Sequence, residues 1–230
     1  MLKAVIFDAY GTLFDTGTGS VDSASRILAK CGRCDIDAKD FYARWKKLHR
    51  FHIDTRSEFI NEEEAFRRDL RALYREYGIE GDAENDLGIM LDTLGKRKAY
   101  TDALETVKYL EGKVLLYIGS TTDTEPLMCD IERSGMVFDG IYTSESLKAY
   151  KPEKEFYERI LEISCLQPEE VLFVGDSPAD DVNGPESVGM TACLINRKGI
   201  KHDGVCPDYE INDMTQLIKI IMQLKIQEMQ

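Results

Sequence analysis

The fold is decided by residues 3–15, which read KAVIFDAYGTLFD. The run from Ala4 to Phe7 is apolar, and it ends at an acid, Asp8, which a glycine turn follows. Such a run predicts a buried strand that opens into a loop. A carboxylate at that point is held beside free backbone N–H groups, so it is a candidate nucleophile. An aspartate at a strand end also commonly serves only to form the loop.

Beyond residue 100 the sequence alternates between strand-like and helix-like segments. Alternation of this kind, with helices of about ten or more residues, indicates βαβ units and a parallel sheet. In an open sheet of this type the ligand site lies at the carboxyl ends of the strands. We therefore expect an α/β protein. The predicted helices are 101–111, 124–134, 153–164, 179–188 and 213–227, and the predicted strands are 114–118, 140–142, 171–174 and 191–195.

Residues 21–94 have a different character. They combine charged and apolar residues at helical spacing, and no segment among them reads convincingly as a strand. We expect an α-helical cap domain over residues 17–96, inserted after the first strand, and a core domain formed by residues 1–16 and 97–230. The predicted helical segments of the insertion are 23–28, 41–51, 57–77 and 83–94.

Four polar clusters fall at the ends of predicted strands: Asp8 to Thr12, Ser120 to Thr122, the region of Lys151, and Asp176 to Asp181. In the last cluster an apolar strand releases Asp176, and Asp181 follows five residues later. These two carboxylates can reach one small volume, which suits a hard cation with oxygen ligands. The alternative is that Asp180 and Asp181 only stabilise the start of a helix.

In this order, the clusters resemble the four signature motifs of the haloacid dehalogenase superfamily, and the resemblance covers nearly the whole chain. It implies a Rossmann-like core with a mobile helical cap, and covalent catalysis by the first aspartate. The motifs are Asp8-x-Tyr10-Gly11-Thr12-Leu13, Ser120-Thr121, Lys151-Pro152, and Gly175-Asp176-Ser177 with Asp181.

The resemblance also implies roles for single residues. Asp8 would be the nucleophile, Ser120 would hydrogen-bond the oxygens of the transferring group, and Lys151 would neutralise the charge around Asp8. In the phosphatase branch, Mg²⁺ would be held by Asp8, the Tyr10 backbone carbonyl and Asp176, with Asp181 close by. The residues expected to contact the substrate are Tyr10, Thr121, Arg44 and Ser177.

One position departs from the phosphatase pattern. Phosphatases of the superfamily usually carry a second aspartate two residues after the nucleophile, and here that position is Tyr10. A tyrosine, with a reference pKa of about 10, is a poor base at neutral pH. The sequence around Tyr10 is instead similar to the 2-haloacid dehalogenase branch, in which Arg44 would grip the substrate carboxylate. Against that branch, those enzymes need no metal and commonly lack the acid that Asp176 supplies.

The leading hypothesis is a Mg²⁺-dependent phosphohydrolase that forms an aspartyl-phosphate at Asp8, because an acidic cluster without a cation is costly in a half-buried cleft. Without a second aspartate, we expect activity mainly on activated phosphoesters. A 2-haloacid dehalogenase is the first alternative. The second is a weakly catalytic or non-catalytic binding protein, since fold alone does not fix function.

Composition limits the partners of the chain. It has 230 residues and a formal net charge of −13, which disfavours binding to nucleic acid or to anionic membrane surfaces. A small anionic substrate therefore needs a local positive pocket. The sequence shows neither a signal peptide nor an apolar run of the roughly 20 residues that span a bilayer. Six scattered cysteines then indicate reduced thiols and a cytoplasmic protein, either a monomer or a homodimer.

Overall fold

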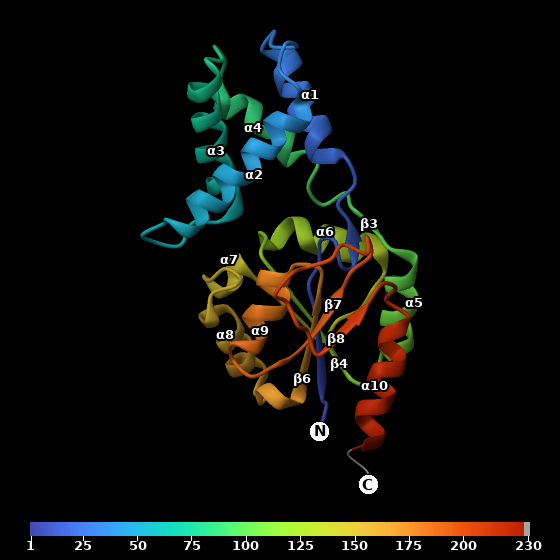
Figure 1. Ribbon diagram of the computed structural model, residues 1–230. Helices are drawn as coiled ribbons and strands as arrows, with labels where there is room; N and C mark the ends of the chain where they lie inside the picture. Colours follow the sequence, from blue (N-terminus) through green and yellow to red (C-terminus); the bar gives the residue numbers. More distant parts are fainter. Residues whose placement is uncertain (228–230) are drawn as a thin grey trace. The chain divides into compact units, whose positions relative to one another are not determined.

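The computed structural model describes residues 1–227, and the chain divides into two compact units (Figure 1). One unit combines Met1–Asp15 with the segment from Lys98 onward, and the other is Thr16–Arg97. The two boundaries between the units fall after Asp15 and after Arg97, each one residue from the expected position. In the described part of the chain, no helix is both long enough and apolar enough to cross a membrane.

The core unit is built on a six-stranded sheet in which every neighbouring pair is parallel. The strand order is β5-β4-β1-β6-β7-β8, so β1 lies inside the sheet with a neighbour on each side. The strands are β1 (Ala4–Phe7), β4 (Leu115–Ser120), β5 (Gly140–Thr143), β6 (Val171–Gly175), β7 (Thr191–Ile195) and β8 (Tyr209–Ile211).

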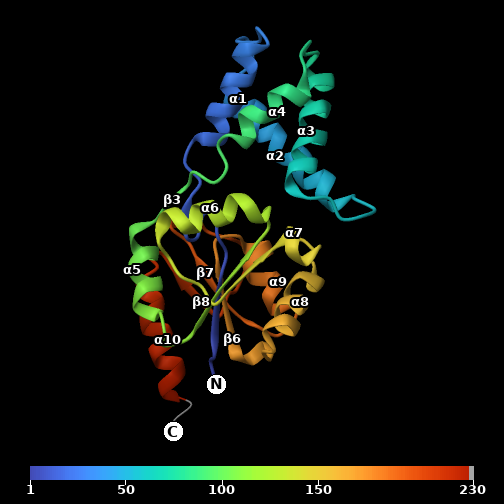
Figure 2. The same ribbon diagram turned by 180° about the vertical axis from the view of Figure 1, so that it is seen from behind.

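Helices cover both faces of this sheet. All four residues of β1 are buried, but they pack alternately: Val5 and Phe7 belong to one apolar cluster, and Ala4 and Ile6 to another. This alternation follows from the two-residue period of a strand. The helices α5 (Thr101–Leu110) and α10 (Gln216–Gln227) lie side by side on one face, and α8 (Lys154–Ser164) covers the other (Figures 1 and 2). The fold is therefore the expected Rossmann-like α/β arrangement.

The second unit is helical. It consists of α1 (Gly19–Lys30), α2 (Ala38–Asp54), α3 (Glu62–Tyr77) and α4 (Ala83–Leu91), packed around an apolar cluster that includes Phe41 and Trp45. The expected helix over 57–77 begins only at Glu62, because the Asn61 side chain accepts a hydrogen bond from the Glu64 N–H and caps the helix there. No strand was expected in this block, and the structure places none within it.

Some predicted elements differ from the structure. The expected helix over 179–188 is a π-helical segment, Pro178–Asn183, followed by the single turn α9 (Gly184–Glu186). The wide turn returns Asp181 to the end of β6, where its Cγ lies 2.2 Å from the position that a Cβ on Gly175 would take. The sequence pattern did not predict five elements: β2 (Phe14–Asp15), β3 (Lys98–Ala99), β8, α7 (Ser144–Leu147) and the short turn η1 (Pro168–Glu170).

The helix α6 spans Thr124–Ser134, as expected. The pair β2 and β3 forms a separate two-stranded antiparallel sheet, in which Phe14 faces Ala99 and Asp15 faces Lys98. These four residues stand where the chain leaves the core unit and returns to it. Each strand has only two residues, which is too short to produce a recognisable sequence pattern.

Candidate active site

The site forms where β1 and β6 end side by side. In the parallel register Phe7 lies opposite Val174, and the Asp8 N–H donates to the Val174 carbonyl at 2.8 Å. The loops that follow these strands therefore leave the sheet at the same edge, as expected for a parallel sheet. The first loop carries Asp8, and the second carries Asp176.

Three carboxylates gather at this edge. One oxygen from each of Asp8, Asp176 and Asp181 lies within 4.8 Å of the others, whereas Asp180 is not part of the group. Asp8 and Asp181 are buried, at 6% and 1% exposure, and Asp176 is exposed. The approach of the first loop to Asp176 requires a glycine, because a Cβ on Gly11 would lie 2.3 Å from Asp176 Oδ2 and the φ angle of Gly11 is +95°.

One ammonium group joins two of these carboxylates. Lys151 is 2% exposed, and its Nζ donates to Asp8 Oδ1 and to Asp181 Oδ1, each at 2.7 Å. Burial alone would lower the pKa of Lys151, but the charges of Asp181 and Asp8 outweigh it and raise that pKa. Lys151 is therefore charged at neutral pH. One positive charge against three carboxylates leaves the ionised cluster two charges negative.

Burial, together with the excess of negative charge, raises the pKa values of the three carboxyl groups. Burial and, secondarily, the Asp8 carboxylate raise the pKa of Asp181 to about 7, even though Lys151 acts in the opposite direction. Removal from water and the charge of Asp181 raise the pKa of Asp176 to about 6. Burial also raises the pKa of Asp8. Such shifts are typical of carboxylates that are removed from water and lack enough positive charge nearby.

These residues fit a divalent cation. Hard cations such as Mg²⁺ take carboxylate oxygens and keep several waters, and the three acids provide oxygen ligands of that kind, one of them open to solvent. A charge of +2 would neutralise the net charge of −2 that remains when the three ionised carboxylates are paired with the Lys151 ammonium. The Ser177 N–H holds the third acid in place by donating to Asp181 Oδ2 at 2.9 Å.

The other residues expected in the core site lie at or just after the ends of two strands that flank β1, which are β4 and β6. Ser120 ends β4, the neighbour of β1, and is 2% exposed. Its side-chain hydroxyl has no hydrogen-bond partner among the described residues, so it is available to an incoming oxyanion. Thr121 follows and is partly exposed. Ser177 is occupied by the turn itself, because its Oγ accepts from the Asp180 N–H at 3.3 Å.

Two of the expected substrate contacts have partners within the protein. The Tyr10 hydroxyl donates to Asp130 Oδ2 at 3.0 Å. Arg44 lies on α2 in the helical unit, where its guanidinium donates to both oxygens of Glu76 at distances of 2.8 to 3.0 Å. A substrate carboxylate would therefore compete with Glu76 for Arg44.

Sequence reasoning assigned no role to Arg197, which fixes the loop after Asp8. Its Nη2 donates to the Thr12 carbonyl at 2.9 Å, and its Nη1 donates to Asp102 Oδ2 at 2.7 Å. The guanidinium also stacks on the Tyr100 ring, 3.9 Å from the centroid. Arg197 thus joins three segments that are far apart in the sequence. Only a run of basic residues after a strand, Arg197-Lys198, marks the position in the sequence.

The fold and these four strand-end motifs define a class of hydrolase. Residues 2–189 match the family described as haloacid dehalogenase-like hydrolase, which covers well over half of the chain. The chain belongs to this family, as the sequence motifs predicted.

Particular relatives include proteins that act on different substrates. An (S)-2-haloacid dehalogenase of Pseudomonas sp. (strain YL) is 25% identical over 231 residues, covering 95% of this chain and 94% of the relative. The pyrimidine 5'-nucleotidase PynA of Streptococcus pneumoniae is 27% identical, covering 94% and 93%. Among solved structures, the HAD-hydrolase YfnB of Bacillus subtilis, bound to magnesium, has a TM-score of 0.81 at 22% identity, covering 96% and 99%, and it shares the fold.

Proposed function

We propose that this hydrolase is a Mg²⁺-dependent phosphohydrolase that acts on a small phosphomonoester through an aspartyl-phosphate at Asp8. The observation that carries the proposal is the set of three carboxylates around a single ammonium group. Displacing halide from carbon creates no dianion, so it gives no reason to keep an exposed third acid, Asp176. Transfer of a phosphoryl group does, because a bound cation lets the Asp8 carboxylate approach an anionic substrate.

In the first step, an oxygen of Asp8 attacks phosphorus while the bond from phosphorus to the leaving oxygen breaks. The Lys151 ammonium fixes the attacking carboxylate through its contact with Oδ1 and offsets the charge of the substrate. The free Ser120 hydroxyl donates to an oxygen of the transferred group. In the second step, water attacks phosphorus, which releases inorganic phosphate and restores the Asp8 carboxylate.

The first test is hydrolysis of p-nitrophenyl phosphate by the full-length protein, with Mg²⁺ and with EDTA. The Tyr10 hydroxyl is bonded to Asp130 and does not supply an acid, so we choose a leaving group that needs no protonation. Turnover that requires Mg²⁺ supports the proposal. Release of halide from 2-chloropropionate in EDTA, without phosphatase activity, would overturn it. Absence of both activities would overturn it in favour of a binding role.

A 2-haloacid dehalogenase is the second candidate. It is favoured by Tyr10, which stands where phosphatases carry an acid, and by the similarity to the (S)-2-haloacid dehalogenase of Pseudomonas. In that reaction Asp8 would attack the carbon that bears the halogen, halide would leave with the bonding electrons, and water would hydrolyse the resulting ester. Lys151 would orient Asp8 in the same way, but Asp176 would have no part in the reaction.

The variant Asp176→Asn separates the two candidates. For a phosphohydrolase we expect a loss of phosphatase activity on the order of 100-fold or more, because a charged ligand of the cation is removed. For a dehalogenase, halide release should be unchanged. Asp180→Asn is the matched control, since Asp180 lies on the same turn outside the group of three. Steady-state rates of both variants at several Mg²⁺ concentrations give the comparison, and full phosphatase activity in Asp176→Asn would contradict the metal role.

The raised pKa values predict how Mg²⁺ stabilises the fold at different pH. Asp176 and Asp181 titrate at about 6 and 7 in the folded, metal-free protein, against about 3.9 in an unfolded chain. The folded state therefore binds more protons, and the site's contribution to stability falls as pH rises from about 4 to 7. Since Mg²⁺ binds ionised carboxylates, we expect it to raise the urea midpoint more at about pH 7.5 than at about pH 5. Equal increases at the two pH values would contradict this prediction.

A further inference from the structure

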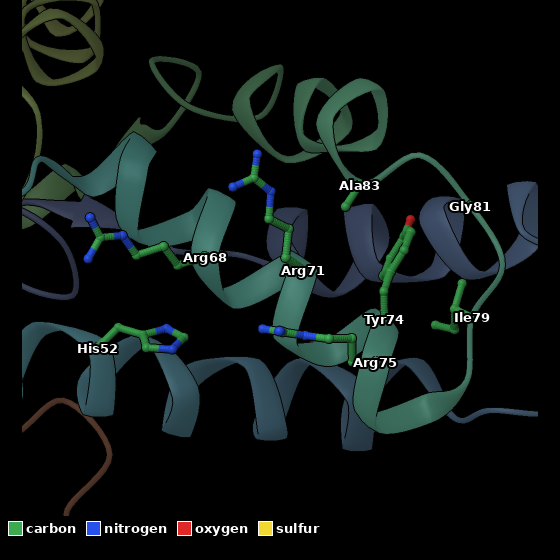
Figure 3. A pocket seen from close by; sticks show the side chains of 8 residues that line it. All are labelled: His52, Arg68, Arg71, Tyr74, Arg75, Ile79, Gly81 and Ala83. Carbon is green, nitrogen blue, oxygen red and sulfur yellow. The ribbon is translucent and has the colours of Figure 1, made fainter.

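A second candidate site lies entirely within the helical unit. A pocket of about 660 Å³ opens between α2, α3 and the loop that leads to α4. In Figure 3 the cationic side chains lie on one side of this pocket, and Tyr74, Ile79 and Gly81 lie on the other. The pocket thus has a charged end and an apolar end. The cationic residues are His52, Arg68, Arg71 and Arg75.

The charged end concentrates positive charge in an acidic protein. Arg68, Arg71 and Arg75 are spaced by three and four residues on α3, so they share one face of the helix. Among the described residues that line the pocket, none carries a carboxylate, although the chain as a whole has a net charge of −13. This arrangement is suited to an anion rather than to a neutral molecule.

The guanidinium groups retain donors for a ligand. Arg68 pairs with Glu64 at 2.9 Å and Arg71 pairs with Glu84 at 2.7 Å, and each uses only part of its fork of five N–H donors. Arg75 has no hydrogen-bond or ion-pair partner anywhere in residues 1–227. It is therefore the cation that a ligand can engage without displacing a carboxylate.

The apolar end is shaped by close packing. Tyr74 is 5% exposed, and its hydroxyl donates to Asp86 Oδ2 at 2.6 Å, which fixes the ring. Gly81 closes this end, because a Cβ there would lie 3.0 Å from both Cys31 Sγ and Tyr74 Cε2. Ile79 adds a buried aliphatic surface. A ligand that fits both ends has a small apolar body joined to an anionic head.

We propose that this pocket binds a small organic phosphate or phosphonate, with its oxyanion held by Arg75 and its neighbours on α3 and its apolar body against Tyr74 and Ile79. Guanidinium groups match tetrahedral oxyanions through paired N–H donors. The proposal goes beyond the hydrolytic function, because it involves none of the residues around Asp8.

The protein contains a reporter for this pocket. Trp45, the single tryptophan, donates from its Nε1 to Asp69 Oδ2 at 3.2 Å, and His52 Nδ1 donates to Asp69 Oδ1 at 2.5 Å. Asp69 is fully buried, so these contacts link the pocket wall to the indole. A ligand that contacts His52 should therefore change the fluorescence of Trp45.

The test is a titration of full-length protein with phenylphosphonate in EDTA, followed by calorimetry and by Trp45 fluorescence. Phenylphosphonate has no ester bond to hydrolyse. We expect saturable binding in the millimolar range or tighter, weakened about tenfold or more in Arg75→Gln through loss of a charge-assisted contact. Arg26→Gln, an exposed arginine on α1 outside the pocket lining, is the matched control and should bind as the wild type does.

Two further arms locate the binding. Phenol, which lacks the charged head, should not bind, and Asp8→Asn should bind phenylphosphonate as the wild type does, whether or not the protein is a phosphohydrolase. No saturable binding, equal affinity in Arg75→Gln and wild type, or equal affinity for phenol would overturn the proposal. Loss of binding in Asp8→Asn with no effect of Arg75→Gln would assign the ligand to the core site instead.

Discussion

We expect the Asp8→Asn variant to lose turnover of p-nitrophenyl phosphate and of 2-chloropropionate alike, by on the order of 10⁴-fold or more. Both candidate reactions use the Asp8 carboxylate as the nucleophile, and an amide oxygen is far less nucleophilic. The result therefore tests the shared chemistry of the site rather than the substrate. Initial rates under the better of the two assay conditions are the measurement.

Two controls make the Asp8 result specific. Asp8→Ala excludes recovery of aspartate by deamidation of the new asparagine. Asp15→Asn removes an exposed acid from the same N-terminal segment and should leave the rate within a few-fold of the wild type. Activity of Asp8→Ala within about 100-fold of the wild type would place the nucleophile elsewhere.

The second large effect is expected for Lys151→Met, and it concerns stability as well as activity. Lys151 is the ammonium that holds Asp8 and Asp181 at 2.7 Å in a buried site. Breaking a buried ion pair by removing one partner typically costs about 3–5 kcal/mol, because the remaining charge is left uncompensated. We expect a loss of that size in the free energy of urea unfolding at about pH 7.5, measured in EDTA, together with loss of catalytic activity.

A double variant distinguishes electrostatics from packing. In Lys151→Met with Asp181→Asn, one of the unpaired carboxylates is also gone, so most of the lost stability should return while activity does not. Added Mg²⁺ should likewise offset part of the loss in the single variant. If Lys151→Met and the wild type unfold at the same urea concentration, the ion pairs seen in the structure do not stabilise it.

The clustering of Asp8 and Asp176 was predictable from the sequence for a geometric reason. An apolar run followed by an acid occurs at Asp8 and again at Asp176, and the ends of neighbouring parallel strands meet at one edge. The role expected for Lys151 came from the family resemblance, because a single lysine forms no sequence pattern that marks its function. Spacing alone did not decide whether Asp181 joins the site or only stabilises the start of a helix. The π-helical turn places it at the strand end, beside Asp176.

Other features depend on contacts that no local pattern reveals. The basic stretch around His49 and His52 reads as a solvated helix face, yet both imidazoles bond to Asp69, which is buried between α2 and α3. Arg197 donates a hydrogen bond to the Thr12 carbonyl, from which it is separated by 185 positions in the sequence. In each case the partner is brought close by packing of distant segments, so periodicity and residue type give no signal.

The short antiparallel pair of β2 and β3 has a consequence for protein engineering. Because Asp15 and Lys98 are paired directly opposite each other, the two segments of the core end side by side, at a spacing that a two-residue hairpin turn can close. Replacing residues 16–97 with such a turn would give a continuous chain that retains the sheet, both of its helical layers and the three acids. A different domain could be inserted at the same junction without changing the topology of the core.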